Sequence, residues 1–318
     1  MIADLAAGHP RAERTRLVLA FAAVYVLWGS TFLGMAFAIR TIPPFLMAGL
    51  RHFVSGIVLL AVTAWRGRRR ATRAEWRDAA IVGVLLLGAN GMVAWAEQRV
   101  ASGTAALLVA TVPLWMVLVD WRRPGGYHPG RGVLIGLGLG FAGLLTLVGP
   151  GALVGHGAVD AGGAAALLLG SFAWGVGSIV AQRQPHTVPP LEAVGMQMAV
   201  GGAALIALAA ATGEMAHFSL ARVSLASALG WGYLVVFGSL IGFTAYAYLL
   251  RKTTAARVST YAYVNPVIAV FLGWAFAGER VTPRTLAAAA VIVSGVAIIT
   301  IARGTAPRRR VAEEAIGD

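Results

Sequence analysis

Ten apolar stretches, each long enough to cross a lipid bilayer as a helix, make up most of the sequence. A spanning helix needs about 20 mostly apolar residues. Hydrophobic residues account for 58% of the chain and charged residues for only 12%, whereas charged residues are about 25% of a typical soluble domain. One soluble core cannot bury so much apolar surface, so we expect an all-α membrane protein with ten transmembrane helices. The predicted helices cover residues 17–39, 44–65, 78–96, 102–121, 132–149, 162–182, 190–211, 223–250, 257–277 and 284–302.

The basic residues are divided unequally between the two ends of the predicted helices. If the N-terminus is cytoplasmic, 20 of the 26 Lys and Arg residues lie on the cytoplasmic side. The exceptions are Arg51, inside a helix, and the outer residues Arg40, Arg99, Arg222, Arg280 and Arg284. Because cytoplasmic loops are enriched in Lys and Arg, both termini are predicted to be cytoplasmic. The placement of the basic residues thus explains the net charge of +13 by topology in a lipid bilayer. We expect no nucleic-acid partner.

The second half of the sequence repeats features of the first half. Two dipeptides recur 146 positions later and an aromatic–proline pair recurs 153 positions later. Five helices in each half is an odd number, so the halves would cross the membrane in opposite directions, as in secondary transporters that bind substrate near the midplane. We expect two inverted five-helix repeats at 17–150 and 151–303, with cytoplasmic tails at 1–16 and 304–318. The matched features are Trp28-Gly29 with Trp174-Gly175, Pro43-Pro44 with Pro189-Pro190, and Trp95 and Pro113 with Tyr248 and Pro266.

Three features follow one another in the stretch Thr253–Thr282. The small residues Ala255-Ala256 come first, Tyr263-Val264-Asn265-Pro266 follows, and Gly278-Glu279 closes the stretch. This order resembles the EamA domain of the drug/metabolite transporter (DMT) superfamily. Residues 101–114 look like the same element in the first half, and residues 113–126 resemble the YedA-like exporter subgroup. The first half departs from the pattern at its end, where Asp120-Trp121 replaces the Gly-Glu pair.

The resemblance covers residues 17–303 and implies both a fold and a function. The fold would be the ten-helix EamA/DMT fold in the cell inner (plasma) membrane. The function would be secondary transport by alternating access, with export of a small-molecule substrate such as an amino acid, a related metabolite or a drug. Import by a DMT-type transporter is the alternative direction. We expect no cofactor, and a monomer or weak dimer.

Arg51 is the only Lys or Arg placed deep inside a predicted helix. Ionisable groups within a bilayer are costly and are functional hypotheses by default. Arg51 is therefore predicted to line the transport pathway and attract a carboxylate; bonding to backbone carbonyls or snorkelling to the surface is the alternative. Its repeat equivalent is Gln197, so the charge is not symmetric. His52 is a second candidate, although it projects about 100° away from Arg51 on a helix.

Amide and aromatic side chains supply the remaining candidates. An unpaired amide in hydrocarbon costs about 4–8 kcal/mol on the harshest scale, so each interior amide must face a partner helix or a wet cavity. Mid-helix tryptophans at repeat-equivalent positions suit a cavity wall, whereas aromatics near helix ends are typical of the membrane interface. The complete set of predicted binding or pathway residues is Trp28, Arg51, His52, Asn90, Trp95, Trp174, Gln197, Tyr248, Tyr263 and Asn265.

The sequence contains few signs of catalysis or metal binding. It has no cysteine, which excludes thiolate metal sites and Cys nucleophiles, and it has neither a His-Glu-x-x-His, a Gly-x-Ser-x-Gly nor a Walker A pattern. We expect no enzyme activity and no metal; an intramembrane enzyme or a lipid-modifying protein is the alternative. Residues 138–143 match a dinucleotide-binding fingerprint, but they lie inside a predicted apolar helix. Their glycines are therefore expected to mediate helix packing, and the same interpretation applies to Gly238 and Gly242.

The carboxylates fall at the ends of predicted helices rather than at the membrane midplane. Glu97, Asp120, Glu192 and Glu279 are all placed there, where cap, macrodipole or interface roles suffice. The sequence therefore does not show a proton relay, and it leaves the coupling mechanism open.

Overall fold

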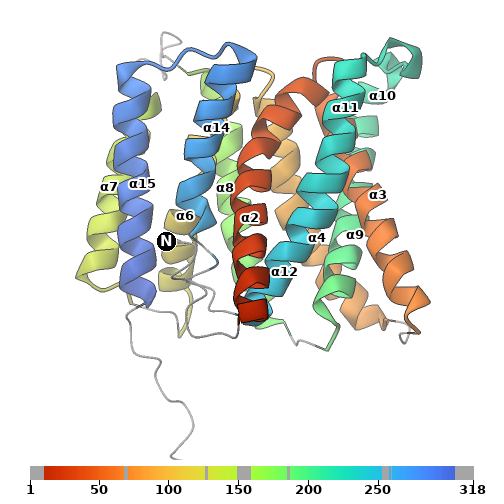
Figure 1. The fold of residues 1–318 in the computed structure, drawn as a ribbon, viewed down its shortest axis with the longest axis horizontal. Coiled ribbons are helices and arrows are strands. Elements are labelled where there is room, and N and C mark those ends of the chain that lie inside the picture. Colours follow the sequence, from red (N-terminus) through yellow and green to blue (C-terminus); the bar gives the residue numbers. More distant parts are fainter. Residues whose placement is uncertain are drawn as a thin grey trace, which may run out of the picture.

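A computed structural model describes residues 11–67, 71–125, 128–148, 159–184, 187–252, 258 and 260–304. Every regular element within these residues is a helix, so the all-helical prediction is confirmed for this part of the chain. Figure 1 shows the helices running side by side as a bundle. They are α2 (Arg11–Ala38), α3 (Pro44–Trp65), α4 (Arg73–Ala96), α5 (Ser102–Val109), α6 (Val112–Arg122), α7 (Arg131–Val148), α8 (Ala161–Arg183), α9 (Pro190–Ala211), α10 (Glu214–His217), η2 (Leu220–Arg222), α11 (Leu225–Tyr233), η3 (Leu234–Ile241), α12 (Gly242–Lys252), α14 (Tyr261–Ala277) and α15 (Pro283–Gly304).

Nine helices of the described chain are long and apolar enough to cross a membrane. They correspond to nine of the ten predicted spans, with α5–α6 forming one span and α11–η3 continuing into α12 as another. The tenth predicted span, 257–277, corresponds to the shorter apolar helix α14. Its predicted start at 257 lies outside the described residues.

Local sequence signals account for several helix boundaries. Proline occupies the first turn of α3 and α9, where its missing N–H has no helical partner to lose. Thr72 and Glu75 form a reciprocal capping box, which starts α4 at residue 73 instead of the predicted 78. The Asp160 side chain accepts a hydrogen bond from the Gly163 backbone N–H and so starts α8.

Two predicted regular helices are interrupted. The predicted helix 102–121 breaks between α5 and α6, where Pro113 stands in the first turn of α6. The predicted helix 223–250 contains a π-helical segment, η3. Wider turns of this kind are frequent at functional sites, and both interruptions lie beside the cavity that the bundle encloses.

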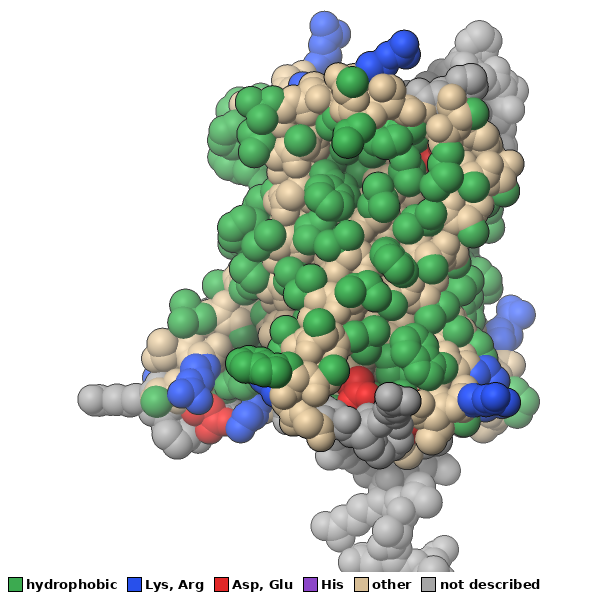
Figure 2. Space-filling model, turned by 90° about the vertical axis from the view of Figure 1, so that its right-hand side faces the viewer, with side chains coloured by type: hydrophobic (Ala, Val, Ile, Leu, Met, Phe, Trp, Pro, Cys, Tyr) green, Lys and Arg blue, Asp and Glu red, His purple; other side chains and the backbone are tan. Residues whose placement is uncertain are grey.

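The two ends of the bundle are named here by the course of α2. The N face is the end at which α2 begins and α15 ends; the far face is the opposite end. Hydrophobic side chains cover the middle of the surface seen in Figure 2, and the Lys and Arg side chains lie toward its two ends. This distribution suits a bilayer, because charged side chains are excluded from its hydrocarbon centre.

Glycines bring pairs of helices into close contact. A Cβ atom added at Gly136 in α7 would lie 2.7 Å from the Gly295 carbonyl oxygen in α15. One added at Gly56 in α3 would lie 2.4 Å from the backbone nitrogen of Ala199 in α9. The packing interpretation of the fingerprint-like glycines is therefore confirmed for α7, whose Gly140 lies against α15 as well as against Leu114.

Candidate functional site

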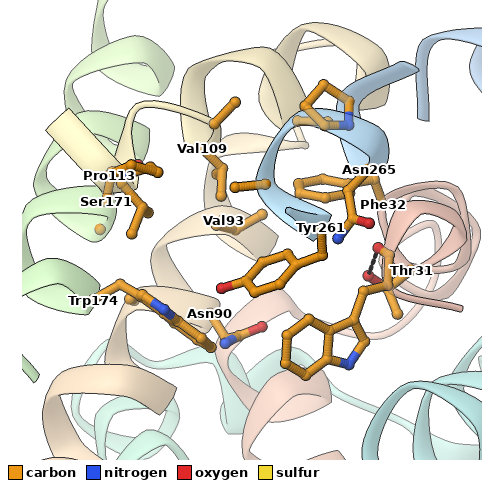
Figure 3. A pocket seen from close by; sticks show the side chains of 18 of the residues that line it. Thr31, Phe32, Asn90, Val93, Val109, Pro113, Ser171, Trp174, Tyr261 and Asn265 are labelled. Carbon is orange, nitrogen blue, oxygen red and sulfur yellow. Dashed lines mark hydrogen bonds between the residues drawn. The ribbon is translucent and has the colours of Figure 1, made fainter. Parts of the chain in front are cut away.

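A cavity of about 360 Å³ lies inside the bundle. It extends from Met35, near the far-face end of α2, to Gln182 and Thr300, near the N-face ends of α8 and α15. Figure 3 shows part of the wall, to which α2, α4, α5, α6, α8 and α14 contribute side chains. The cavity is therefore bounded by helices from both halves of the sequence and approaches the N face.

One wall of the cavity is an aromatic cluster around Trp28. The ring centroid of Trp28 lies 5.2 Å from that of Phe243 and 5.1 Å from those of Tyr246 and Tyr261. The Phe243 and Tyr261 contacts are edge-on, the favourable geometry for aromatic pairs. The indole N–H of Trp28 donates to the Gly238 carbonyl at 3.2 Å. This hydrogen bond holds the indole ring, so it offers a fixed apolar surface.

The repeat-equivalent tryptophan lies across the cavity. Trp174 is on α8, and Figure 3 shows the Tyr261 hydroxyl pointing toward Trp174 and Asn90. The side-chain amide of Asn90 donates to the Leu86 carbonyl of its own helix at 3.3 Å. Polar and aromatic groups thus meet where a bound molecule would contact both halves of the chain.

Arg51 is the only formally charged residue among the described residues that line the cavity. Its side chain is buried, with 3% of its surface exposed. Its Nε donates to the Ser239 hydroxyl at 2.9 Å, and its two Nη groups donate no hydrogen bond within the described chain. A guanidinium can hold a carboxylate through two parallel hydrogen bonds. Arg51 is therefore positioned by Ser239 and retains donors for an anion.

The η3 segment receives the side chains of Trp28 and Arg51. A Cβ atom at Gly238 would lie 2.8 Å from Arg51 Nη2, and one at Gly242 would lie 2.6 Å from Trp28 Nε1. The glycine-mediated packing that the sequence predicts at these positions is therefore confirmed, and two of the side chains that pack there, Trp28 and Arg51, also line the cavity.

Asn265 is held by backbone groups on two helices. In the amide orientation that satisfies its hydrogen bonds, its nitrogen donates to the carbonyls of Tyr25 in α2 and Tyr261 in α14, at 3.1 and 3.2 Å. The next residue, Pro266, has no N–H to donate to the preceding turn. Asn265 therefore ties α14 to α2 beside the proline, and it also lines the cavity.

The structure brings together half of the predicted site residues. Trp28, Arg51, Asn90, Trp174 and Asn265 line the cavity. The other five do not belong to its lining: His52, Trp95, Gln197, Tyr248 and Tyr263.

These five residues occupy other surroundings. His52 is fully buried, and neither ring nitrogen has a hydrogen-bond partner in the described structure. Trp95 lies under the Arg99 guanidinium, whose carbon is 4.4 Å from the ring centroid. The backbone of Gln197 packs against α4, while Tyr248 and Tyr263 pack against the main apolar core.

Several lining residues were absent from the predicted set. Phe243 and Tyr261 form half of the aromatic cluster. Phe243 follows Asn90 by the same 153 positions that separate Pro113 from Pro266, so the repeat could have identified it. Met116 and Thr31 carry no comparable signal, because apolar and hydroxyl residues are common throughout such helices.

Comparisons with known proteins agree with one another. The EamA-like transporter family matches residues 15–149 and 161–301. The uncharacterized inner membrane transporter YedA of Escherichia coli (strain K12) is 37% identical over 299 residues, which cover 93% of this chain and 94% of YedA. The uncharacterized transporter YoaV of Bacillus subtilis (strain 168) is 25% identical over 93% of this chain and 99% of YoaV. One crystal structure, 22% identical, superposes with a TM-score of 0.62 over 91% of this chain and 99% of that chain.

Proposed function

Since the chain belongs to the EamA-like transporter family, we propose that it is a secondary transporter of the inner membrane that exports small metabolites with a carboxylate group. Amino acids are the first substrate class to consider. The inner-membrane location is supported by the name of the YedA relative and by the nine apolar helices of the described chain.

One observation carries the substrate class: among the described lining residues a single cation, Arg51, faces a largely apolar cavity that also presents aromatic rings and side-chain amides. A cavity of about 360 Å³ is within the range of small-molecule sites, about 300–1,000 Å³. The guanidinium would bind the carboxylate, and Trp28 and Trp174 would pack on the remainder of the substrate. Such a lining favours binding and release over the alternative of an intramembrane enzyme, which would need complementary reactive groups in one place.

Helix packing supports an inverted relation between the halves, taken as residues 17–150 and 151–303. The first helix of the first half, α2, packs on α14 of the second half. The first helix of the second half, α8, packs correspondingly on α5 and α6. Equivalent helices also pack on each other, as α3 does on α9 and α7 on α15. The two family matches, 15–149 and 161–301, support the same division.

Alternating access follows from two such halves around one cavity. The excess of Lys and Arg supports a cytoplasmic N face, with both termini inside. The cavity approaches that face through Gln182 and Thr300, so this conformation would load substrate from the cytoplasm. Rocking of one half against the other would then open the far face.

A substrate screen tests the proposed function. The pure protein is reconstituted in liposomes loaded with labelled amino acids or related carboxylates, and efflux is compared with that from protein-free liposomes. Arg40→Gln supplies a matched control, because Arg40 stacks on Phe37 and does not line the cavity. We expect wild type and Arg40→Gln to move the same solutes. Failure of both to move any solute in a broad panel would contradict the proposal.

Two further aspects have their own tests. A cytoplasm-dependent reporter fused at residue 318 should be active, whereas one fused at residue 155 should be inactive; the reverse result would invert the orientation. The proposed monomer or weak dimer is tested by the mass of the protein in dilute detergent, where a stable higher assembly would contradict it.

A further inference from the structure

Glu97 lies at the far face without a partner for its charge. It directly follows the last residue of α4, and both its carboxylate oxygens are buried with no hydrogen bond in the described structure. A helix C-terminus carries a partial negative charge, so a carboxylate is unfavourable there. The interpretation of this side chain as a cap or a macrodipole partner is therefore wrong.

A second carboxylate at the far face, that of Glu279, has hydrogen-bond donors. The oxygens of Glu279 accept hydrogen bonds from the backbone N–H groups of Ser102 and Gly103, at 2.7 and 3.0 Å. Gly278 ends α14 at a positive φ of 68°, which turns the chain so that Glu279 reaches the start of α5. At the far face, this contact joins the end of α14, in the second half, to α5 of the first half.

The buried hydroxyl of Ser102 completes the cluster. Ser102 is 1% exposed, and its Oγ has no hydrogen-bond partner in the described structure. Both Ser102 Oγ and Glu279 Oε2 lie close to Gly273: a Cβ atom there would be 3.1 Å from the hydroxyl and 2.4 Å from the carboxylate. The Glu279 carboxylate and the unpartnered Ser102 hydroxyl thus lie together at Gly273, and the negative charge of Glu279 acts on Glu97.

The cluster lies between the cavity and the far face. Val93 and Ala106 line the cavity on α4 and α5. Glu97 follows Val93 by four residues and Ser102 precedes Ala106 by four, so each lies one helical turn, about 6 Å, further toward the far face.

Electrostatics distinguishes the two carboxylates. Burial and then the negative charge of Glu279 raise the pKa of Glu97, while the cavity residue Arg51 acts in the opposite direction. Two backbone N–H groups at a helix N-terminus donate to the Glu279 carboxylate, an arrangement that favours a negative charge. Glu97 has no such donors in the described structure, and a like charge nearby disfavours its ionisation.

We propose that Glu97 is a proton-binding site that takes up one proton when the far face closes and releases it when that face opens. On opening, water reaches the carboxyl group, its O–H bond breaks, and the proton passes to solvent at the far face while the electron pair stays on Glu97. The proton comes from solvent at the far face as that face closes and returns there when it opens, so no proton crosses the membrane in this step. Bound to Glu97, it removes the repulsion between the Glu97 and Glu279 charges while the Glu279–α5 contact is in place. The proton site therefore gates the far face, a role that rests on the proposed function.

Infrared spectroscopy of the purified full-length protein tests the site without any substrate. We expect wild type at neutral pH to show the C=O stretching band of a protonated carboxyl group. The band should be absent in Glu97→Gln and shifted in Glu97→Asp, and raising the pH should remove it with release of about one proton per molecule. Glu192→Gln is the matched control, because Glu192 is a buried glutamate on α9, and it should retain the band.

Three results would overturn the site. The first is absence of the band in wild type, and the second is persistence of the band in Glu97→Gln. The third is a band that appears only when sodium is replaced by choline, which would assign the cluster to a metal cation. Transport in liposomes separates this proposal from the previous one. A Glu97 band without movement of any solute would contradict the transport function alone, whereas solute movement without the band would contradict the proton site alone. Where both proposals hold, external pH sets the protonation of Glu97, so efflux by wild type depends on external pH and efflux by Glu97→Gln does not.

Discussion

Replacement of Arg51 by glutamine separates a binding role from a structural one. Glutamine already occupies the repeat-equivalent position 197, so the side chain is compatible with the surroundings of such a helix. The change removes the only formal charge among the described lining residues and leaves the cavity walls in place. It also removes the hydrogen bond from Nε to Ser239.

The expected effect follows from the contacts of the guanidinium. A hydrogen bond to a charged group contributes about 1.5–3 kcal/mol, and each 1.4 kcal/mol is a factor of about ten in affinity. Loss of one net charged contact to a substrate carboxylate should therefore raise KM by about 10- to 150-fold. Stability should change less, because burying a mid-helix arginine itself costs about 2.5–3.5 kcal/mol.

Both quantities are measured on the same purified protein. Concentration-dependent efflux from liposomes gives KM per folded molecule, and thermal unfolding in detergent gives Tm. Arg40→Gln is the control, since Arg40 lies outside the cavity lining. An unchanged KM for Arg51→Gln, or a loss of transport that only follows a loss of folded protein, would refute the binding role.

Three further predictions concern glycines and pH. Gly238→Ala would place a Cβ atom 2.8 Å from Nη2 of Arg51, so the rate of transport in liposomes should fall. Gly232→Ala is the control, because a Cβ atom there meets nothing within 4 Å, and it should transport normally. Equal rates for the two variants would contradict the role of η3. Gly136→Ala should lower the free energy of unfolding by about 1–3 kcal/mol through overpacking. Gly138→Ala on the same helix should not, because a Cβ atom there meets nothing within 4 Å. Thermal unfolding of the two variants measures the difference. Because the pKa of Glu97 is raised in the folded protein, the protonated Glu97 side chain should contribute fully to stability below about pH 4.3. This contribution should decline as the pH rises toward the folded-state pKa. If Tm of Glu97→Gln depends on pH as that of wild type does, this prediction is wrong.

The sequence predicts the helices well because their signal is strong and local. Each span is a long apolar run, and Pro44 and Pro190 mark two starts directly. The π-helical turns of η3 carry no such local signal, and the residues that bond to them, Trp28 and Arg51, come from other helices. The early start of α4 could have been predicted from Thr72 and Glu75, whose spacing is that of a capping box.

The candidate site is predictable where polarity or symmetry marks a residue. Arg51 stands out because a charge inside an apolar helix is rare, and Trp28 and Trp174 stand out because they recur at one offset. Polarity alone was not sufficient for His52, which is equally buried but lies outside the cavity lining. Which side of a helix faces a cavity depends on how the helices pack, and that information is absent from the local sequence.

Alternating access requires that one cavity, shared by both halves, binds substrate and opens to each side in turn. The natural chain has no cysteine, so Ser171→Cys places a single thiol in the cavity wall. Its labelling by a membrane-impermeant maleimide is measured from each side of oriented vesicles, with and without a solute identified in the efflux screen. We expect labelling from the cytoplasmic side, slower labelling from the outside, and protection from both sides by the transported solute. A thiol that reacts from neither side, or that the transported solute leaves unprotected, would contradict the claim.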